Sequence, residues 1–98
     1  MPLDNKTARK IVEDKALPLL KERFGVPFDA TPIAVTRLEI GWMFELSPTK
    51  SITRDGRRIY NVRYIVDDRN HRLHIVGTPG VDRAIERIKA DWVKMKNG

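Results

Sequence analysis

The fold is decided by residues 41–79, whose sequence is GWMFELSPTKSITRDGRRIYNVRYIVDDRNHRLHIVGTP. Apolar and polar side chains alternate along this stretch, which is typical of β-strands. The even-numbered positions predict one buried sheet face, made up of Trp42, Phe44, Leu46, Tyr60, Val62, Tyr64 and Val66. Arginines fall on turns or on the opposite face, and no recognisable catalytic set is present. The pattern favours a binding surface over an active site.

The alternation begins before this stretch. From Ile33 to Ser47 it continues across Gly41, so one long strand bent at that glycine and two strands joined by a tight turn both fit. Residues 50–57 are a polar connection with Asp55-Gly56 as the turn. The remaining segments are a strand over 58–66, a turn over 67–70 and a last short strand with Leu73, Ile75 and Val76.

Helices are expected on both sides of these strands. Residues 4–24 have a helical apolar stripe, with Asp4 or Asn5 as the cap and Gly25 with Pro27 as the stop signal. Pro18 lacks the amide that would bond to the carbonyl of Asp14, so it predicts a kink or a new segment. Residues 81–96 predict the closing helix, with Thr78 as N-cap, Pro79 at the first position and an apolar stripe of Val81, Ile85, Ile88, Trp92 and Met95.

The order of these elements predicts the α+β class. We expect a single domain over residues 1–98, with an N-terminal helix, an antiparallel sheet of three to four strands and a C-terminal helix, in the order α-β-β-β-β-α. One face of the sheet is expected to be covered. The stripe of the closing helix suits docking on the sheet or a dimer contact, so a monomer and a homodimer both remain open.

Charge and composition limit the class of partner. The formal net charge is +6, and residues 50–75 hold seven basic and three acidic side chains, whereas residues 1–49 are balanced. This asymmetry favours an acidic partner, either a protein or a nucleic-acid backbone. The chain has no cysteine, and we find neither a secretory signal nor an apolar run that could span a membrane. A cytoplasmic protein without a membrane partner is expected.

The residue types that carry chemistry do not combine into a catalytic or metal site. His71 and His74 are three residues apart, so they face opposite sides of a strand and are interpreted as surface histidines. Asp67 and Asp68 are interpreted as turn residues that pair with Arg69 and other nearby arginines. We therefore expect a protein that is not an enzyme and that has no cofactor and no metal.

The arginines are the candidates for function. The predicted partner-binding residues are Arg54, Arg57, Arg58, Arg63, Arg69 and Arg72, on a basic sheet face and its hairpins. Because Tyr60 and Tyr64 share the parity of the core residues, they are assigned to the core rather than to stacking on bases. Trp42 and Trp92 are predicted to be core anchors.

Several short motifs carry a resemblance to a known family. These are Gly41-Trp42-Met43-Phe44, then Tyr64-Ile65-Val66-Asp67, then Leu73-His74-Ile75-Val76-Gly77-Thr78, between two amphipathic helices. The arrangement resembles the YrhB-like immunity protein family of bacterial polymorphic toxin systems. The resemblance implies a small α+β protein that neutralises a cognate toxin without catalysis or a cofactor. The matching positions, which it implies are fold determinants, are Gly41, Trp42, Asp67, Gly77 and Thr78.

Two departures from the family pattern stand out. The connection from Thr49 to Arg58 is unusually rich in arginine, and the turn from Asp67 to Leu73 has Asn70-His71 where such turns often carry glycine. The main hypothesis is an immunity or inhibitor protein that blocks an acidic surface or cleft of a toxin. The alternative is a small basic domain that binds nucleic acid through the same arginines.

Overall fold

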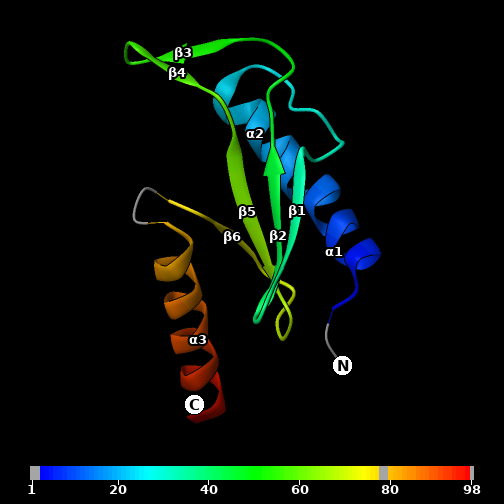
Figure 1. Cartoon of the computed structure of the whole chain (residues 1–98), viewed down its shortest axis with the longest axis vertical. Coiled ribbons are helices and arrows are strands. Elements are labelled where there is room, and N and C mark those ends of the chain that lie inside the picture. Colours follow the sequence, from blue (N-terminus) through cyan, green and yellow to red (C-terminus); the bar gives the residue numbers. More distant parts are fainter. Residues whose placement is uncertain (1–2, 78–79, 98) are drawn as a thin grey trace.

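A computed structural model of the chain describes residues 3–77 and 80–97 (Figure 1). The elements in order are α1 (Asn5–Ile11), the π-helical turn η1 (Val12–Ala16), α2 (Leu17–Phe24), β1 (Ala34–Leu38), β2 (Gly41–Leu46), β3 (Ile52–Arg54), β4 (Arg57–Ile59), β5 (Val62–Asp67), β6 (Leu73–Ile75) and α3 (Val81–Asn97). The predicted α+β class is confirmed. The predicted helix cap at Thr78 and Pro79 falls outside the described residues.

The strands form two antiparallel sheets. The larger has the order β1-β2-β5-β6, and β3 pairs with β4 in a separate hairpin that extends from one end of it (Figure 1). In the larger sheet Tyr64 on β5 lies between Phe44 on β2 and Ile75 on β6. Since β5 runs from the β3–β4 hairpin to the β5–β6 turn, these two connections lie at opposite ends of the sheet.

The N-terminal helix is interrupted, as Pro18 predicts, but by a π-helical turn. Asp4 caps α1 by accepting a hydrogen bond from the Thr7 amide at 2.7 Å, and Gly25 ends α2 in the left-handed conformation at φ 70°. The wider turn η1 precedes Pro18, which lies in the first turn of α2. Pro18 has no amide to donate and crowds the preceding turn, and proline is tolerated where a helical segment begins. Both capping predictions are confirmed.

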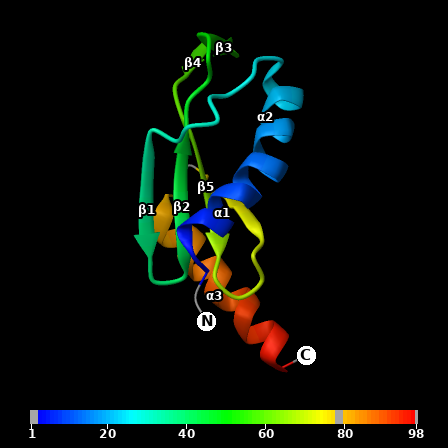
Figure 2. The same cartoon turned by 90° about the vertical axis from the view of Figure 1, so that its right-hand side faces the viewer.

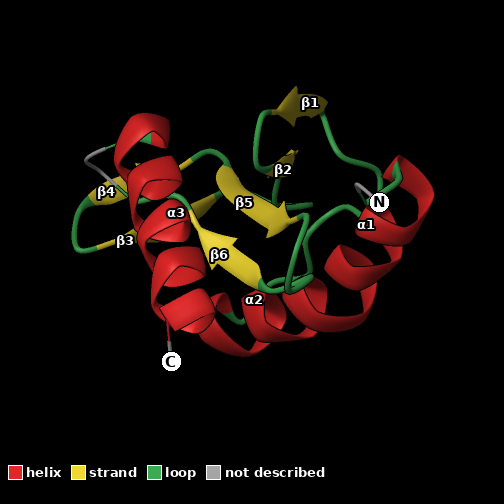
Figure 3. Ribbon diagram, turned by 90° about the horizontal axis from the view of Figure 1, so that it is seen from below, coloured by secondary structure: helices red, strands yellow, loops and turns green. Residues whose placement is uncertain are grey.

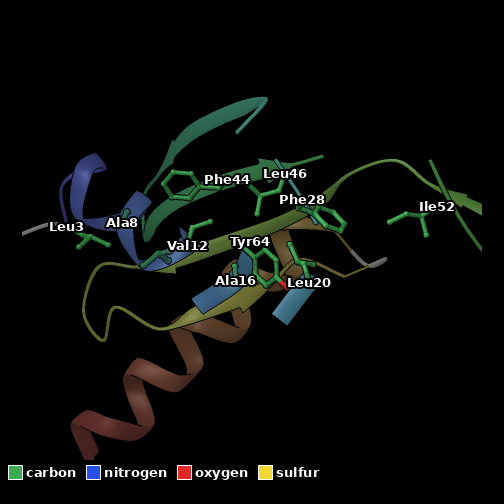
Figure 4. Packing of buried hydrophobic residues seen from close by; sticks show 11 residues of the cluster. Leu3, Ala8, Val12, Ala16, Leu20, Phe28, Phe44, Leu46, Ile52 and Tyr64 are labelled. Carbon is green, nitrogen blue, oxygen red and sulfur yellow. The ribbon is translucent and has the colours of Figure 1, made fainter. Parts of the chain in front are cut away.

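The main core lies between the N-terminal helices and the even-numbered face of the sheet. Ala8, Val12, Ala16 and Leu20 are buried at a spacing of four, which places them on one side of the helix. Figure 2 shows that α1 and α2 lie along one face of the sheet. Their buried residues pack with Phe44, Leu46 and Tyr64 (Figure 4), and the same cluster includes Val66. The prediction that these four sheet residues are buried is confirmed.

A second core covers the opposite face of the sheet, so the expectation of a single covered face is wrong. Ala84 and Ile88 of α3 pack against Ile65 of β5 and Ile40 of the β1–β2 turn. Ile65 has the opposite parity to Tyr64 and Val66, and α3 lies on the far side of β5 and β6 from α1 (Figure 3). Each face of the sheet therefore has its own helix layer.

Two strand assignments need correction or resolution. The segment Ile33–Ser47 is two strands, β1 and β2, joined by a tight turn at Glu39 and Ile40. The expected strand over 58–66 is divided at Tyr60 and Asn61, because β4 pairs with β3 whereas β5 pairs with β2. Tyr60 falls in this break and is 66% exposed, so its assignment to the core is wrong.

Gly41 has a steric role where β2 meets β5. It lies opposite Asp67, and a β-carbon at this position would overlap with the carbonyl oxygen of Val66 and lie 3.0 Å from the α-carbon of Asp67. Only glycine permits two backbones to come this close. Because Gly41 has no side chain, β2 can lie this close to the end of β5, which carries Asp67 and is followed by Asp68.

Candidate partner-binding surface

The six arginines predicted to bind a partner do not share one face. Arg54, Arg57 and Arg58 lie on the β3–β4 hairpin, Arg63 lies on β5, and Arg69 and Arg72 lie in the β5–β6 turn. The six residues of β5 separate the hairpin from the turn by about 20 Å. The structure brings the first three together, and we call residues 52–59 the arginine hairpin.

The arginine hairpin has a regular two-residue turn, as its Asp55-Gly56 pair predicts. Asp55 and Gly56 have φ angles of 53° and 75°, and two positive φ values match the twist of paired strands. The register places Arg54 directly opposite Arg57. Like charges at opposed positions repel each other, so this arrangement costs stability.

Aromatic rings hold two of the hairpin arginines. The Arg58 guanidinium lies 5.3 Å from the centre of the Tyr60 ring and donates a 3.0 Å hydrogen bond to the Ser51 hydroxyl. The Arg54 guanidinium lies 5.5 Å from the centre of the Phe24 ring of α2. These contacts orient the guanidinium groups without neutralising their charge. Arg57, Arg58 and Tyr60 are all exposed, and Arg58 lies beside Tyr60.

No carboxylate neutralises the predicted arginines within the described residues. The ion pairs found there join Arg9 to Glu13, Arg37 to Asp68, and Lys89 to Glu39, with His74 beside Asp67. None of these contacts includes one of the six arginines. The positive charge of the hairpin is thus available to a partner.

A pocket of about 660 Å³ opens beside the arginine hairpin. It lies between α2, the hairpin and the edge strand β6, and its lining consists of Leu19, Glu22, Arg23, Arg54, Tyr64, Leu73 and Ile75. These residues come from four separate elements and were not predicted together from the sequence. No local pattern marks such a pocket, because only the packing of α2 against the sheet places its walls.

Asp67 forms a closed network instead of the expected pairing with arginines. Its side chain is 1% exposed, and its Oδ1 accepts hydrogen bonds from the amides of Arg69 and Asn70 and from Trp92 Nε1, at 3.1, 2.6 and 3.4 Å. His74 Nε2 lies 2.8 Å from Oδ2, so the interpretation of His74 as a surface residue is wrong. An ionised carboxylate only accepts, so His74 donates from this nitrogen.

The electrostatics of Asp67 suit a structural role. Burial acts to raise the pKa of Asp67, but the hydrogen bonds from Asn70, His74 and Trp92 outweigh it and hold the pKa below its usual range. The carboxylate therefore stays charged at neutral pH, with its oxygens occupied by donors. It fastens the β5–β6 turn and α3 to the end of β5.

Asp68 forms a second network on the other side of the sheet. Arg37 on β1 donates two hydrogen bonds to its carboxylate, at 2.9 and 2.7 Å, and the Leu3 amide donates a third at 3.2 Å. Trp42 Nε1 donates to the Leu3 carbonyl at 2.6 Å. The hydrogen bond from Arg37 lowers the pKa of Asp68. These contacts attach the N-terminal segment to the sheet.

In the β5–β6 turn, which lies between the two networks, a histidine takes the backbone conformation that a glycine often adopts in such turns. His71 adopts a φ of 56° and its amide donates to the carbonyl of Asp67 at 3.0 Å. Histidine is one of the residues that enter the left-handed region more readily. His71 is exposed, whereas His74 points toward Asp67, so the two rings do not converge. Within residues 3–77 and 80–97 no cluster of three or more His, Cys, Asp or Glu residues could hold a metal ion.

The residues that carry the family resemblance occupy this same region. Gly41, Trp42 and Asp67 lie where β2, β5 and the two networks meet, while Gly77 is exposed after β6 and Thr78 lies outside the described residues. Comparison of the chain with protein-family models, curated proteins and solved structures finds no match. The resemblance to YrhB-like immunity proteins therefore stays a prediction from motifs. None of the helices in the part of the chain that the structure describes could cross a membrane.

Proposed function

We propose that this protein is a non-catalytic inhibitor of the immunity type, which captures a bacterial toxin by binding an acidic surface or cleft with its arginine hairpin. The observation that carries the proposal is the hairpin itself. Three arginines are concentrated on six paired residues at one end of the molecule, two of them directly opposed, and no ion pair among the described residues includes them.

The physical chemistry of the hairpin suits capture of a protein. An exposed cluster of one charge accelerates association with a surface of the opposite charge. Tyr60 beside Arg58 adds an aromatic residue next to arginine, and these two residue types are enriched among those that dominate binding energy. The charge of the arginine hairpin can thus accelerate association, and Arg58 with the neighbouring Tyr60 is a candidate for the contact that dominates the binding energy. The family resemblance supports the same type of partner.

The geometry of the polar groups supports a role without catalysis. The buried carboxylate of Asp67 has its oxygens occupied by four donors and its pKa is lowered, which suits neither a general base nor a general acid at neutral pH. Asp68 is bound by Arg37 and by the Leu3 amide. We expect these groups to hold the fold while the arginine hairpin makes the contact.

The test is capture of the product of the neighbouring reading frame in the source genome, by co-expression and co-purification. The double variant Arg57→Glu with Arg58→Glu should weaken the complex by about 100-fold, because two attractive charges become repulsive. The matched control is Lys6→Glu with Lys10→Glu, which makes the same change of charge on the exposed side of α1. The control should lose less than about three-fold. Equal losses, or a complex that survives the hairpin reversal at low salt, would contradict the proposal.

One observation favours the second candidate, a nucleic-acid-binding domain. Tyr60 is exposed and lies under Arg58, and an aromatic ring beside arginines can stack on an unpaired base. This candidate predicts binding to single-stranded DNA or RNA that weakens steeply as salt increases, and a loss on Tyr60→Ala. A flat titration at physiological salt would exclude it.

A further inference from the structure

We propose that the pocket between α2, the arginine hairpin and β6 binds an acidic side chain carried on an apolar segment of the protein partner. This inference rests on the proposed function and names the chemistry of the segment that is recognised. The pocket has a volume of about 660 Å³, in the range of binding sites for small groups. Its lining divides into an apolar half and a cationic half.

The apolar half consists of side chains that are unusually exposed for their type. Leu19 on α2 is 55% exposed and Ile75 on β6 is 43% exposed, and both line the pocket together with Leu73. Single exposed apolar residues are common, but adjacent ones that line a concave surface typically mark a binding site. These residues provide a surface for apolar side chains on either side of an acidic one.

The cationic half is made by two arginines from distant parts of the sequence. Arg23 and Arg54 line the pocket, and their guanidinium carbons lie 5.7 and 5.5 Å from the centre of the same Phe24 ring. Both are absent from the ion pairs of the described residues. Two guanidinium groups held on one ring form a preorganised site for a carboxylate, which guanidinium binds with charge-assisted hydrogen bonds.

Tyr64 supplies the third group. Its side chain is over nine-tenths buried and lines the pocket, and its hydroxyl takes part in none of the hydrogen bonds found among the described residues. Burial raises the pKa of Tyr64, while the charge of Arg23 acts in the opposite direction, so the hydroxyl keeps its proton at neutral pH. No buried polar side-chain atom among the described residues lacks a partner, so this hydroxyl is open to the pocket, where a bound carboxylate would accept its hydrogen bond.

Two details define how the segment binds. Arg87 of α3 donates a hydrogen bond to the Ile75 carbonyl at 3.1 Å, which occupies part of the outer edge of β6. Binding through side chains in the pocket is therefore favoured over the addition of a new strand to β6. Among the described residues of the lining, Glu22 is the one acidic group, and its charge opposes an incoming carboxylate. Its removal should strengthen binding.

The experiment is a titration followed by NMR on the ¹⁵N-labelled full chain, including the arginine Nε signals. The probe is a capped tripeptide, acetyl-Leu-Glu-Leu-amide, and the matched probe has Gln in place of Glu. The acidic peptide should shift the signals of Arg23, Arg54 and β6 and should bind about five-fold more tightly than the Gln peptide. Sodium acetate at the same concentration tests for a site that binds a free anion without the apolar segment.

Variants separate the pocket from general charge. Arg54→Gln should weaken the acidic peptide by about five-fold, whereas Arg57→Gln, which removes the directly opposed arginine outside the pocket, should change its affinity less than two-fold. Glu22→Gln should strengthen it by about two-fold. Tyr64→Phe should weaken it by about three-fold, and an unchanged affinity in this variant would overturn the role of the hydroxyl.

The opposite results overturn the proposal. The proposal is overturned if the Glu and Gln peptides bind equally, or if Arg54→Gln and Arg57→Gln lose equal affinity. It is also overturned if the signal shifts map to other residues, or if equimolar acetate displaces the peptide. Failure of the pocket proposal can be distinguished from failure of the proposed function. Toxin capture that needs Arg57 and Arg58 but tolerates Arg54→Gln and Tyr64→Phe would exclude the pocket while leaving the function in place.

Discussion

Asp67 and Asp68 are neighbours in the sequence, yet they work on opposite sides of the sheet. The side chain of Asp67 is 1% exposed and connects β5 to the β5–β6 turn and to α3. The side chain of Asp68 is 13% exposed and connects β5 to β1 and to the N-terminal segment through Arg37 and Leu3. Adjacent residues at the end of a strand thus fasten both helix layers.

The two networks have similar parts but differ in burial. Each contains a tryptophan whose ring faces an arginine, with the guanidinium carbon at 4.4 Å for Arg69 over Trp92 and 5.2 Å for Arg37 over Trp42. The Asp67 network depends on buried donors, whereas the Asp68 network is an ion pair near the surface that water can partly replace. The attachment of α3 should therefore be the more sensitive to mutation.

Gly41→Ala should break both networks at once and have the largest effect. The new β-carbon would overlap with the Val66 carbonyl and push away the end of β5, from which both aspartates extend. We expect a loss of about 4 kcal/mol in the free energy of unfolding, measured by urea denaturation and circular dichroism. Gly56→Ala, in the open turn of the arginine hairpin, is the control for backbone strain without a clash, and it should cost about 1 kcal/mol because Gly56 has a φ of 75°. A mild effect of Gly41→Ala would contradict the steric account.

Asp67→Asn tests the difference between the two networks directly. The amide keeps the shape of the side chain but removes its charge and one of its acceptor oxygens, so buried donors lose their partner. The expected loss is about 3 kcal/mol. Asp68→Asn is the matched control, and it should cost about 1 kcal/mol because Arg37 remains accessible to water. Equal losses in the two variants would show that burial does not distinguish them.

Lowering the pH should reduce the stability that the two aspartates provide. The pKa values of Asp67 and Asp68 are both lowered in the folded chain, so the stability they provide is complete above the ordinary Asp pKa and is lost as the pH falls through the lower folded values. Each additional proton bound by the unfolded chain contributes a slope of about 1.4 kcal/mol per pH unit. Asp67→Asn should therefore flatten the dependence of unfolding free energy on pH below the ordinary Asp pKa of about 4. An unchanged slope would contradict a lowered pKa at Asp67.

Local signals predicted most of the fold. Asp4, Gly25 and the Asp55-Gly56 pair each mark a boundary that depends on a few neighbouring residues, and the structure has a cap, a stop and a turn there. The prediction that Tyr60 is buried was wrong, because the alternation of apolar and polar residues does not reveal that the chain changes pairing partner between β4 and β5. Docking of the closing helix on the sheet was one of the two predicted alternatives, but the face that it covers was not predicted, because Ile40 and Ile65 are scattered in sequence and form a core only when α3 packs on them.

The candidate site was predicted in part. The arginines are visible in the sequence, but their division between the hairpin and the distant turn depends on how β5 separates them. The pocket could not be predicted, since Arg23 and Arg54 meet only through the Phe24 ring. The resemblance implied that Asp67 is a fold determinant, but its bonding partners were not predicted, because a carboxylate next to arginines in sequence usually pairs with them at the surface. Here its donors come from β6 and from α3.

The bonds of Leu3 have a consequence for synthesis of the chain. Its carbonyl binds Trp42, 39 residues further along, and its amide binds Asp68, 65 residues further along. On the ribosome, α1 therefore emerges long before the residues that hold it in place, and its apolar stripe has no sheet to cover until β5 follows. We expect the N-terminal helix to stay sensitive to protease in nascent chains that end before β5, and to become resistant only once Asp68 has emerged.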